Sequence, residues 1–178
     1  MTCIVGISDG KNVTLGGDAA ASSATDRELY ILRTEKVFAA GEYLIGYCAS
    51  YRAGQIAQYQ VDWPAPPEDK DANLCRFVVN EVVPVLQKAL EGSGMTQPGQ
   101  FLIGLRGHLF SIAHDFSATE LEEPWIAIGS GRMPAYGALY AMEDSPLDPK
   151  TKARRALEAA ERYTNNVRQP FVVLSSQA

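Results

Sequence analysis

The chain begins with short apolar runs separated by polar turns, a pattern typical of β-hairpins. Apolar runs at 3–8 and 12–18 flank Asp9-Gly10-Lys11, and an Asp-Gly turn between two such runs is a strong hairpin signal. Further hairpins are predicted from 36–40 with 43–49 and from 100–105 with 108–113, and single strands at 125–128 and 170–175. The region 19–33 is small, polar and poorly periodic, so we expect a loop with a short strand at 29–32.

Helical spacing of apolar residues marks the remaining segments. A first helix is expected over 51–59, and a long amphipathic helix over 72–91, where Pro84 should introduce a kink. Two more helices are expected over 134–142 and 150–163. Helices therefore occur in clusters and do not alternate with single strands. This order argues against a doubly wound parallel sheet and favours an α+β fold, with two packed antiparallel sheets and helix pairs outside them.

Length and composition narrow the class of protein. With 178 residues we expect a single domain spanning 1–178. The net charge of −5 and the absence of any Lys/Arg block argue against binding nucleic acid. No apolar stretch approaches about 20 residues, so we expect no membrane span, and no signal peptide is visible. The three cysteines are odd in number and lack CxxC spacing, which favours free thiols in a cytoplasmic protein and makes a zinc site improbable.

Candidate chemistry is found at the second residue. Initiator methionine is generally removed when the next residue is small, so the working chain could begin at Thr2. A terminal threonine carries a hydroxyl nucleophile and an α-amine whose pKa is near ~8. Nucleophile and base would then reside on one residue, as in enzymes activated by their own terminal amine. The alternative is that Thr2 is simply the first residue of a strand.

Three further features accompany Thr2 in a defined order. Asp18 ends the second strand in Leu-Gly-Gly-Asp, Lys36 begins the third in Glu-Lys-Val-Phe, and Gly129-Ser130-Gly131 forms a late strand-to-helix turn. This set resembles the β subunits of the proteasome and the bacterial HslV peptidase, which are N-terminal-nucleophile (Ntn) hydrolases. It is also similar to the shorter proteasome-like proteins of some bacteria and phages, in stretches such as MTCIVG, GEYLIGY and ALEAAER. The resemblance extends from Met1 to Leu174.

The resemblance implies a four-layer αββα sandwich and a threonine-type peptidase without metal or organic cofactor. It makes Thr2 the nucleophile, its amine the general base, and Lys36 a buried cation beside it. Asp18 would keep Lys36 protonated, and Ser130 would hold the amine in place. The family supplies a backbone N–H for the oxyanion from a glycine after the fourth strand. Here that position falls at Tyr47 or Cys48, and we assign the N–H of Cys48 to it.

The resemblance also implies partners: an unfolded polypeptide or peptide substrate, a homo-oligomeric ring, and an ATP-dependent unfoldase as a candidate. Two other functions stay open, an inactive assembly subunit and a small-amide Ntn hydrolase. Residue by residue, simpler roles compete. Asp18 could be a turn residue, Lys36 a solvated lysine, and Ser130 only the N-cap of the next helix. A Cys/His pair using His108 or His114 is disfavoured, because nothing ties either histidine to a cysteine.

Overall fold

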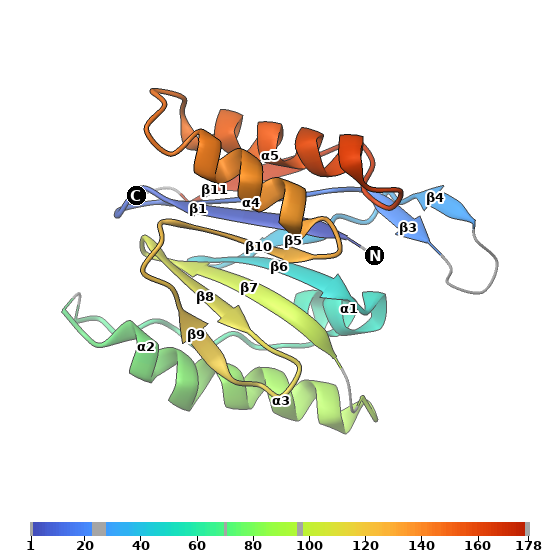
Figure 1. The fold of residues 1–178 in the computed structure, drawn as a ribbon. Coiled ribbons are helices and arrows are strands. Elements are labelled where there is room, and N and C mark those ends of the chain that lie inside the picture. The colour runs from blue at the N-terminus through green and yellow to red at the C-terminus, as the bar shows by residue number, and fades with distance from the viewer. Residues whose placement is uncertain (1, 23–27, 70, 96–97, 177–178) are drawn as a thin grey trace.

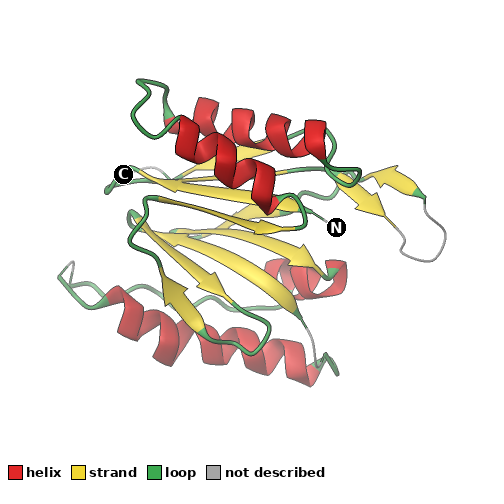
Figure 2. Ribbon diagram, in the orientation of Figure 1, coloured by secondary structure: helices red, strands yellow, loops and turns green. Residues whose placement is uncertain are grey.

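The computed structural model describes residues 2–22, 28–69, 71–95 and 98–176. Two antiparallel sheets pack face to face, with helices covering both outer faces (Figures 1 and 2). The first sheet has the order β10-β1-β2-β11, and the second the order β5-β6-β7-β8-β9. This arrangement confirms the expected α+β fold and its four αββα layers.

The bounds of the elements are as follows. The first sheet contains β1 (Cys3–Ser8), β2 (Val13–Gly17), β10 (Trp125–Gly129) and β11 (Val172–Ser175). The second contains β5 (Val37–Ala40), β6 (Tyr43–Ala49), β7 (Gly99–Leu105), β8 (His108–Ile112) and β9 (Ala118–Glu120). Helices α4 (Arg132–Ala141) and α5 (Pro149–Tyr163) cover the first sheet, and α1 (Tyr51–Tyr59), α2 (Leu74–Phe77) and α3 (Val83–Gly92) lie on the side of the second (Figure 1).

Strand β1 shows how the sequence produces the layers. Its residues are apolar on both sides because both of its faces are covered. Ile4 packs between the two sheets, whereas Cys3 and Val5 pack under α4 and α5. The hairpin to β2 closes through Asp9, whose carboxylate accepts hydrogen bonds from the backbone N–H groups of Lys11 and Asn12 at 2.9 and 2.7 Å. Strand β1 is therefore fixed in the middle of the molecule, and Thr2 lies at its start.

Three local predictions differ from the structure. The helix expected over 72–91 is interrupted by a π-helical turn at Val78–Val82, in which the N–H of Val83 bonds to the carbonyl of Val78. Pro84 follows directly, because a proline in a regular helix would clash with the carbonyl four residues earlier. The short strand expected at 29–32 is confirmed as β4 (Leu29–Ile31), but it pairs with a strand β3 (Ala20–Ser22) where a loop was expected, and residues 23–27 of that loop lie outside the described residues. Strand β9 was also not predicted, since its side chains are mostly exposed.

None of the helices in the described part of the chain is long and apolar enough to cross a bilayer.

Candidate active site

The pairing of β1 with β2 brings Thr2 and Asp18 to the same end of the first sheet. In this register Ile4 lies opposite Gly17, so the residues beside them, Cys3 and Asp18, are neighbours. The N–H of Cys3 donates to Oδ1 of Asp18 at 3.0 Å, and the N–H of Asp18 donates to the carbonyl of Cys3 at 3.4 Å. The Asp18 carboxylate is therefore fixed beside the backbone of residue 3.

Lys36 reaches the same carboxylate from the second sheet. It directly precedes β5 and is held by the N–H of Tyr47, which donates to the Lys36 carbonyl at 3.1 Å. Its Nζ donates to Asp18 Oδ1 at 2.9 Å and to the Ala20 carbonyl at 2.5 Å. Asp18 Oδ2 accepts from the N–H of Ala20 at 2.9 Å. Sequence alone could not exclude that Lys36 is solvated or that Asp18 is a turn residue; in the structure they form a buried ion pair.

Burial dominates the electrostatics of this pair. Thr2, Asp18 and Lys36 expose only 3%, 2% and 1% of their surfaces. Loss of hydration lowers the pKa of Lys36 below its ordinary value, and the charge and hydrogen bond of Asp18 act in the opposite direction. A buried ammonium without a partner would tend to lose its proton. Asp18 is thus the group that favours a charged Lys36 at this position.

The Gly129-Ser130-Gly131 turn contacts Thr2 from the opposite side. Strand β10 pairs with β1 so that Cys3 lies opposite Gly129. The backbone nitrogen of Thr2 donates to Ser130 Oγ at 3.2 Å, and Ser130 Oγ donates to the Thr2 carbonyl at 3.4 Å. The N–H of Gly131 also donates to that carbonyl, at 3.2 Å. The N-cap of α4 is Gly131 and has no side-chain cap bond, so the interpretation of Ser130 as only the N-cap of that helix is wrong.

The two glycines of this turn are required by the close approach to β1. Gly129 has φ +92°, and a Cβ atom there would lie 2.3 Å from the Thr2 carbonyl oxygen. A Cβ on Gly131 would lie 2.7 Å from Cβ of Cys3. Larger residues would push the turn away from Thr2 and break the contacts of Ser130.

The C-terminal end of β6 lies against the same turn. A Cβ on Gly129 would lie 3.5 Å from Cβ of Cys48, which is itself buried. The left-handed backbone conformation that favours glycine occurs at Ala49, with φ +77°, and not at Tyr47 or Cys48. The oxyanion role assigned to the N–H of Cys48 stays a prediction.

No protein-family model matches the chain, and no curated protein matches it by sequence. Among solved structures, BPH from Thiobacillus denitrificans in complex with epoxomicin is similar over 98% of both chains, with 20% identity and a TM-score of 0.78. HslV from Trypanosoma brucei is similar over 97% of this chain and 98% of its own, with 17% identity and a TM-score of 0.68. Anbu, an ancestral β-subunit from Yersinia bercovieri, matches 99% of this chain and 81% of its own, with 13% identity and a TM-score of 0.69.

The chain has the fold of the proteasome-like Ntn hydrolases. At these identities the likeness establishes the fold, and the arrangement of side chains comes from the contacts above. Within this proteasome-like fold, the four residues that the sequence singled out, Thr2, Asp18, Lys36 and Ser130, lie at one end of the two sheets.

The surroundings of Cys3, Cys48 and His108 do not support a catalytic Cys/His pair. Burial, followed by the nearby Asp18 carboxylate, raises the pKa of the Cys3 thiol to about 12, and burial also raises the pKa of Cys48. Both thiols are therefore protonated and poorly nucleophilic at neutral pH. His108 has its Nδ1 2.6 Å from the Glu120 carboxylate on β9, which gives no support to a Cys/His pair.

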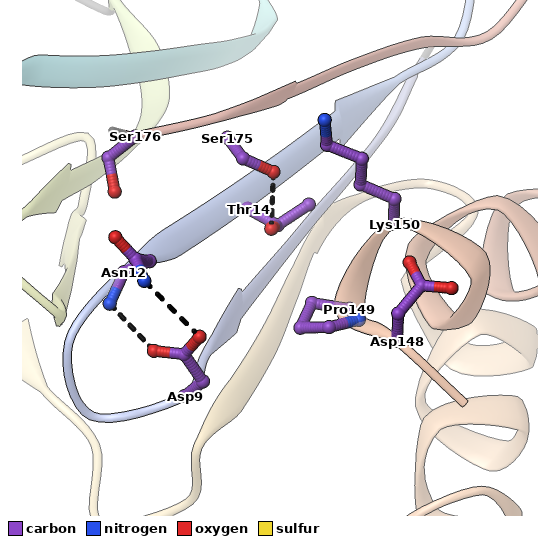
Figure 3. A pocket seen from close by; sticks show the side chains of 8 residues that line it. All are labelled: Asp9, Asn12, Thr14, Asp148, Pro149, Lys150, Ser175 and Ser176. Atoms are coloured by element: carbon purple, nitrogen blue, oxygen red, sulfur yellow. Dashed lines mark hydrogen bonds between the residues drawn. The ribbon is translucent and has the colours of Figure 1, made fainter. Parts of the chain in front are cut away.

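A surface pocket lies elsewhere in the proteasome-like fold. Its lining consists of Asp9, Asn12, Thr14, Asp148, Pro149, Lys150, Ser175 and Ser176 (Figure 3). Asp9 follows the last residue of β1, whereas Thr2 precedes the first, so the pocket and Thr2 lie at opposite ends of this strand, about 20 Å apart. Its polar groups are partly used within the protein, since Asp9 bonds to Asn12 and Thr14 Oγ1 lies 2.8 Å from Ser175 Oγ.

Two groups that lie beside Lys36 were not predicted from the sequence. The Ala20 carbonyl accepts from Lys36, and the Tyr51 hydroxyl donates to the same carbonyl at 3.1 Å. A backbone carbonyl leaves no signature in residue types. Tyr51 lies two residues after the end of β6, but nothing in the sequence shows that its side chain reaches β3.

Proposed function

We propose that this protein is a threonine-type peptidase that hydrolyses peptide bonds through Thr2, exposed by removal of Met1. The observation that supports the proposal is the convergence of Thr2, Asp18, Lys36 and Ser130 from four separate parts of the sequence. A structural ion pair alone would not require a serine hydroxyl on the nitrogen of the adjacent threonine. An N-terminal nucleophile requires a group at that position.

The geometry suggests a sequence of proton transfers. With Met1 removed, the nitrogen that donates to Ser130 becomes an amine, which in its neutral form takes the proton of Thr2 Oγ. Oγ then forms a bond to the substrate carbonyl carbon, and backbone N–H groups at the end of β6, with Cys48 as the assigned donor, stabilise the oxyanion. The C–N bond breaks, and the leaving amine takes the proton from the terminal ammonium. Water then hydrolyses the ester, and Oγ regains a proton.

Lys36 and Asp18 would serve the first of these steps. A buried ammonium close to Thr2 favours the neutral amine over the ammonium form, because two cations in a low-dielectric site repel each other. It also stabilises negative charge that develops on Oγ. Asp18 holds Lys36 in its charged form, and it orients the backbone of residue 3 at 3.0 Å. The proposed mechanism uses groups of this chain alone and assigns no step to a metal or an organic cofactor.

The proposal extends to assembly. We propose a cytoplasmic homo-oligomeric ring that encloses the Thr2 sites and receives unfolded polypeptide, with an ATP-dependent unfoldase as the candidate partner. Support comes from the fold shared with HslV and from exposed apolar side chains on α4, where Met133 and Tyr140 expose 68% and 71% of their surfaces. Such side chains are suited to contacts between subunits.

The function is tested by offering the purified protein two kinds of substrate. We expect cleavage of an unfolded polypeptide such as reduced, alkylated casein, with little hydrolysis of small amides such as glutamine, and an intact mass that lacks Met1. Hydrolysis of small amides alone would replace the proposal with a small-amide Ntn hydrolase. Retention of Met1 without any hydrolysis would identify an inactive assembly subunit.

A further inference from the structure

The carbonyl of Ala20 is shared by two donors that come from different layers. Lys36 Nζ donates to it at 2.5 Å and the Tyr51 hydroxyl at 3.1 Å. The N–H of Ala20 donates to Asp18 Oδ2 at 2.9 Å. Both backbone polar groups of Ala20 are thus used by the Asp18–Lys36 pair, although β3 belongs to a separate small sheet.

Tyr51 is well placed to fix this carbonyl. It is the first residue of α1, and the preceding Ser50 caps the helix by accepting from the N–H of Ala53 at 3.1 Å. Burial, together with the nearby Asp18 charge, raises the pKa of the Tyr51 hydroxyl to about 12. The hydroxyl therefore stays protonated and keeps donating throughout the physiological range. The capped start of α1 thus places the donor, and the donor bonds to the Ala20 carbonyl.

We infer that Tyr51 is a positioning residue for Lys36: its hydroxyl fixes the Ala20 carbonyl as the second acceptor of the Lys36 ammonium. The inference rests on the proposed function only where activity is the readout. A buried ammonium is stabilised by oriented acceptors, and an acceptor that is free to move stabilises it less. Removing the hydroxyl should leave Lys36 easier to deprotonate without removing any group that touches substrate.

The groups that set the charge of Lys36 come from several elements. They are Asp18 after β2, Cys3 on β1, Cys48 on β6 and Tyr51 on α1. Asp18 is the anion among them. Both thiols have pKa values raised above the ordinary value, and the pKa of Tyr51 is raised as well. After removal of Met1 the Thr2 α-amine joins this cluster; its ordinary pKa is near ~8, and its loss of a proton beside Lys36 produces the rising, acidic limb of the activity profile. Lys36 is therefore the group whose loss of charge produces the falling, alkaline limb.

The test is the Tyr51→Phe variant, studied over a pH series. The active form requires a charged Lys36, so activity falls as pH rises through the Lys36 pKa, which burial already lowers. In Tyr51→Phe we expect this fall to begin about half a pH unit or more lower, because a weaker acceptor lowers the pKa further. We also expect kcat at the optimum to fall by about three- to tenfold, with KM little changed.

Tyr43→Phe is the matched control. The Tyr43 hydroxyl also donates to a backbone carbonyl, that of Pro64, at 2.6 Å. Tyr43 is the first residue of β6. Tyr47, whose N–H bonds to the Lys36 carbonyl, lies four positions further along the same strand. Tyr43→Phe should lose a comparable hydrogen bond and leave the alkaline limb unchanged. The same alkaline limb in wild type and Tyr51→Phe, or equal shifts in both variants, would overturn the inference.

A readout independent of turnover separates this inference from the proposed function. In protein carrying 13Cε-labelled lysine, the Lys36 resonance is assigned by its loss in Lys36→Arg and then titrated. We expect a lower Lys36 pKa in Tyr51→Phe than in wild type and no difference in Tyr43→Phe. An inactive wild type would contradict the peptidase proposal, and this titration would still decide the role of Tyr51.

Discussion

Replacing Thr2 by alanine is expected to reduce peptide hydrolysis by at least about 10³-fold, because the variant has no side-chain oxygen to attack the carbonyl. Alanine is small, so removal of Met1 should proceed as before. The fold should be retained, since the backbone contacts to Ser130 and Gly131 stay in place when the side chain is shortened. Thr2→Ser keeps the hydroxyl and should keep measurable activity. Initial rates on a fluorogenic peptide, with thermal unfolding in parallel, provide the comparison.

Thr14→Ala is the control for this experiment. Thr14 is also a buried threonine, and its hydroxyl lies 2.8 Å from Ser175 Oγ on β11. It lines the pocket at the other end of the sheet from Thr2. Its loss should cost about 1 kcal/mol of stability and leave the rate near that of wild type. Comparable activity in Thr2→Ala and wild type would rule out Thr2 as the nucleophile.

Breaking the Asp18–Lys36 pair should affect both stability and rate. Lys36→Met leaves a buried carboxylate without its cation, and Asp18→Asn leaves a buried ammonium without its anion. Each single change is expected to lower the free energy of unfolding by about 3 kcal/mol or more and to abolish most activity. Chemical denaturation and kcat/KM measure the two effects separately.

The double variant Asp18→Asn/Lys36→Met distinguishes catalysis from structure. Without either charge the desolvation cost disappears, so the double variant should be more stable than the less stable single variant. The recovery will be partial, because an Asn side chain cannot accept from the N–H groups of both Cys3 and Ala20 as the carboxylate does. Activity should stay lost. Recovery of activity together with stability would assign the pair a structural role only.

The exposed pair Arg106–Glu42 provides a reference for ordinary ion pairs. Its donor and acceptor are 2.7 Å apart, but both side chains are partly solvent-exposed. Glu42→Gln should therefore change stability by less than about 1 kcal/mol and leave the rate unaltered.

The sequence predicted most of the sheet architecture because its signals were local. The Asp9-Gly10 turn between two apolar runs predicted the β1–β2 hairpin, and register then placed Cys3 beside Asp18. The strand at β3 was missed because Ala20–Ser22 carries no β-branched or aromatic residue. The π-helical turn before Pro84 was also missed, since a proline indicates an irregularity without specifying its form.

For the candidate site, the residue types could be predicted from the sequence, whereas their contacts are visible in the structure. The order of Thr2, Asp18, Lys36 and the Gly-Ser-Gly turn was informative only through resemblance, because each residue had an ordinary alternative. The roles of backbone groups could not be predicted from residue types, because the contacts of the Ala20 carbonyl and the left-handed conformation of Ala49 depend on tertiary packing. Tyr51 was missed for the same reason, since its partner is a carbonyl on a distant strand.

The proposed activity requires that Thr2 become a terminal residue whose amine and hydroxyl act together. A peptide epoxyketone tests it directly, because its ketone carbon and its epoxide carbon can add to the hydroxyl and the amine of one residue, and no leaving group departs. Treated protein is digested and the adduct is mapped by tandem mass spectrometry, with Thr2→Ala as the control. We expect one adduct, of the full reagent mass, on a peptide that begins at Thr2 and lacks Met1. An adduct elsewhere, or an unmodified Thr2 still joined to Met1, would contradict it.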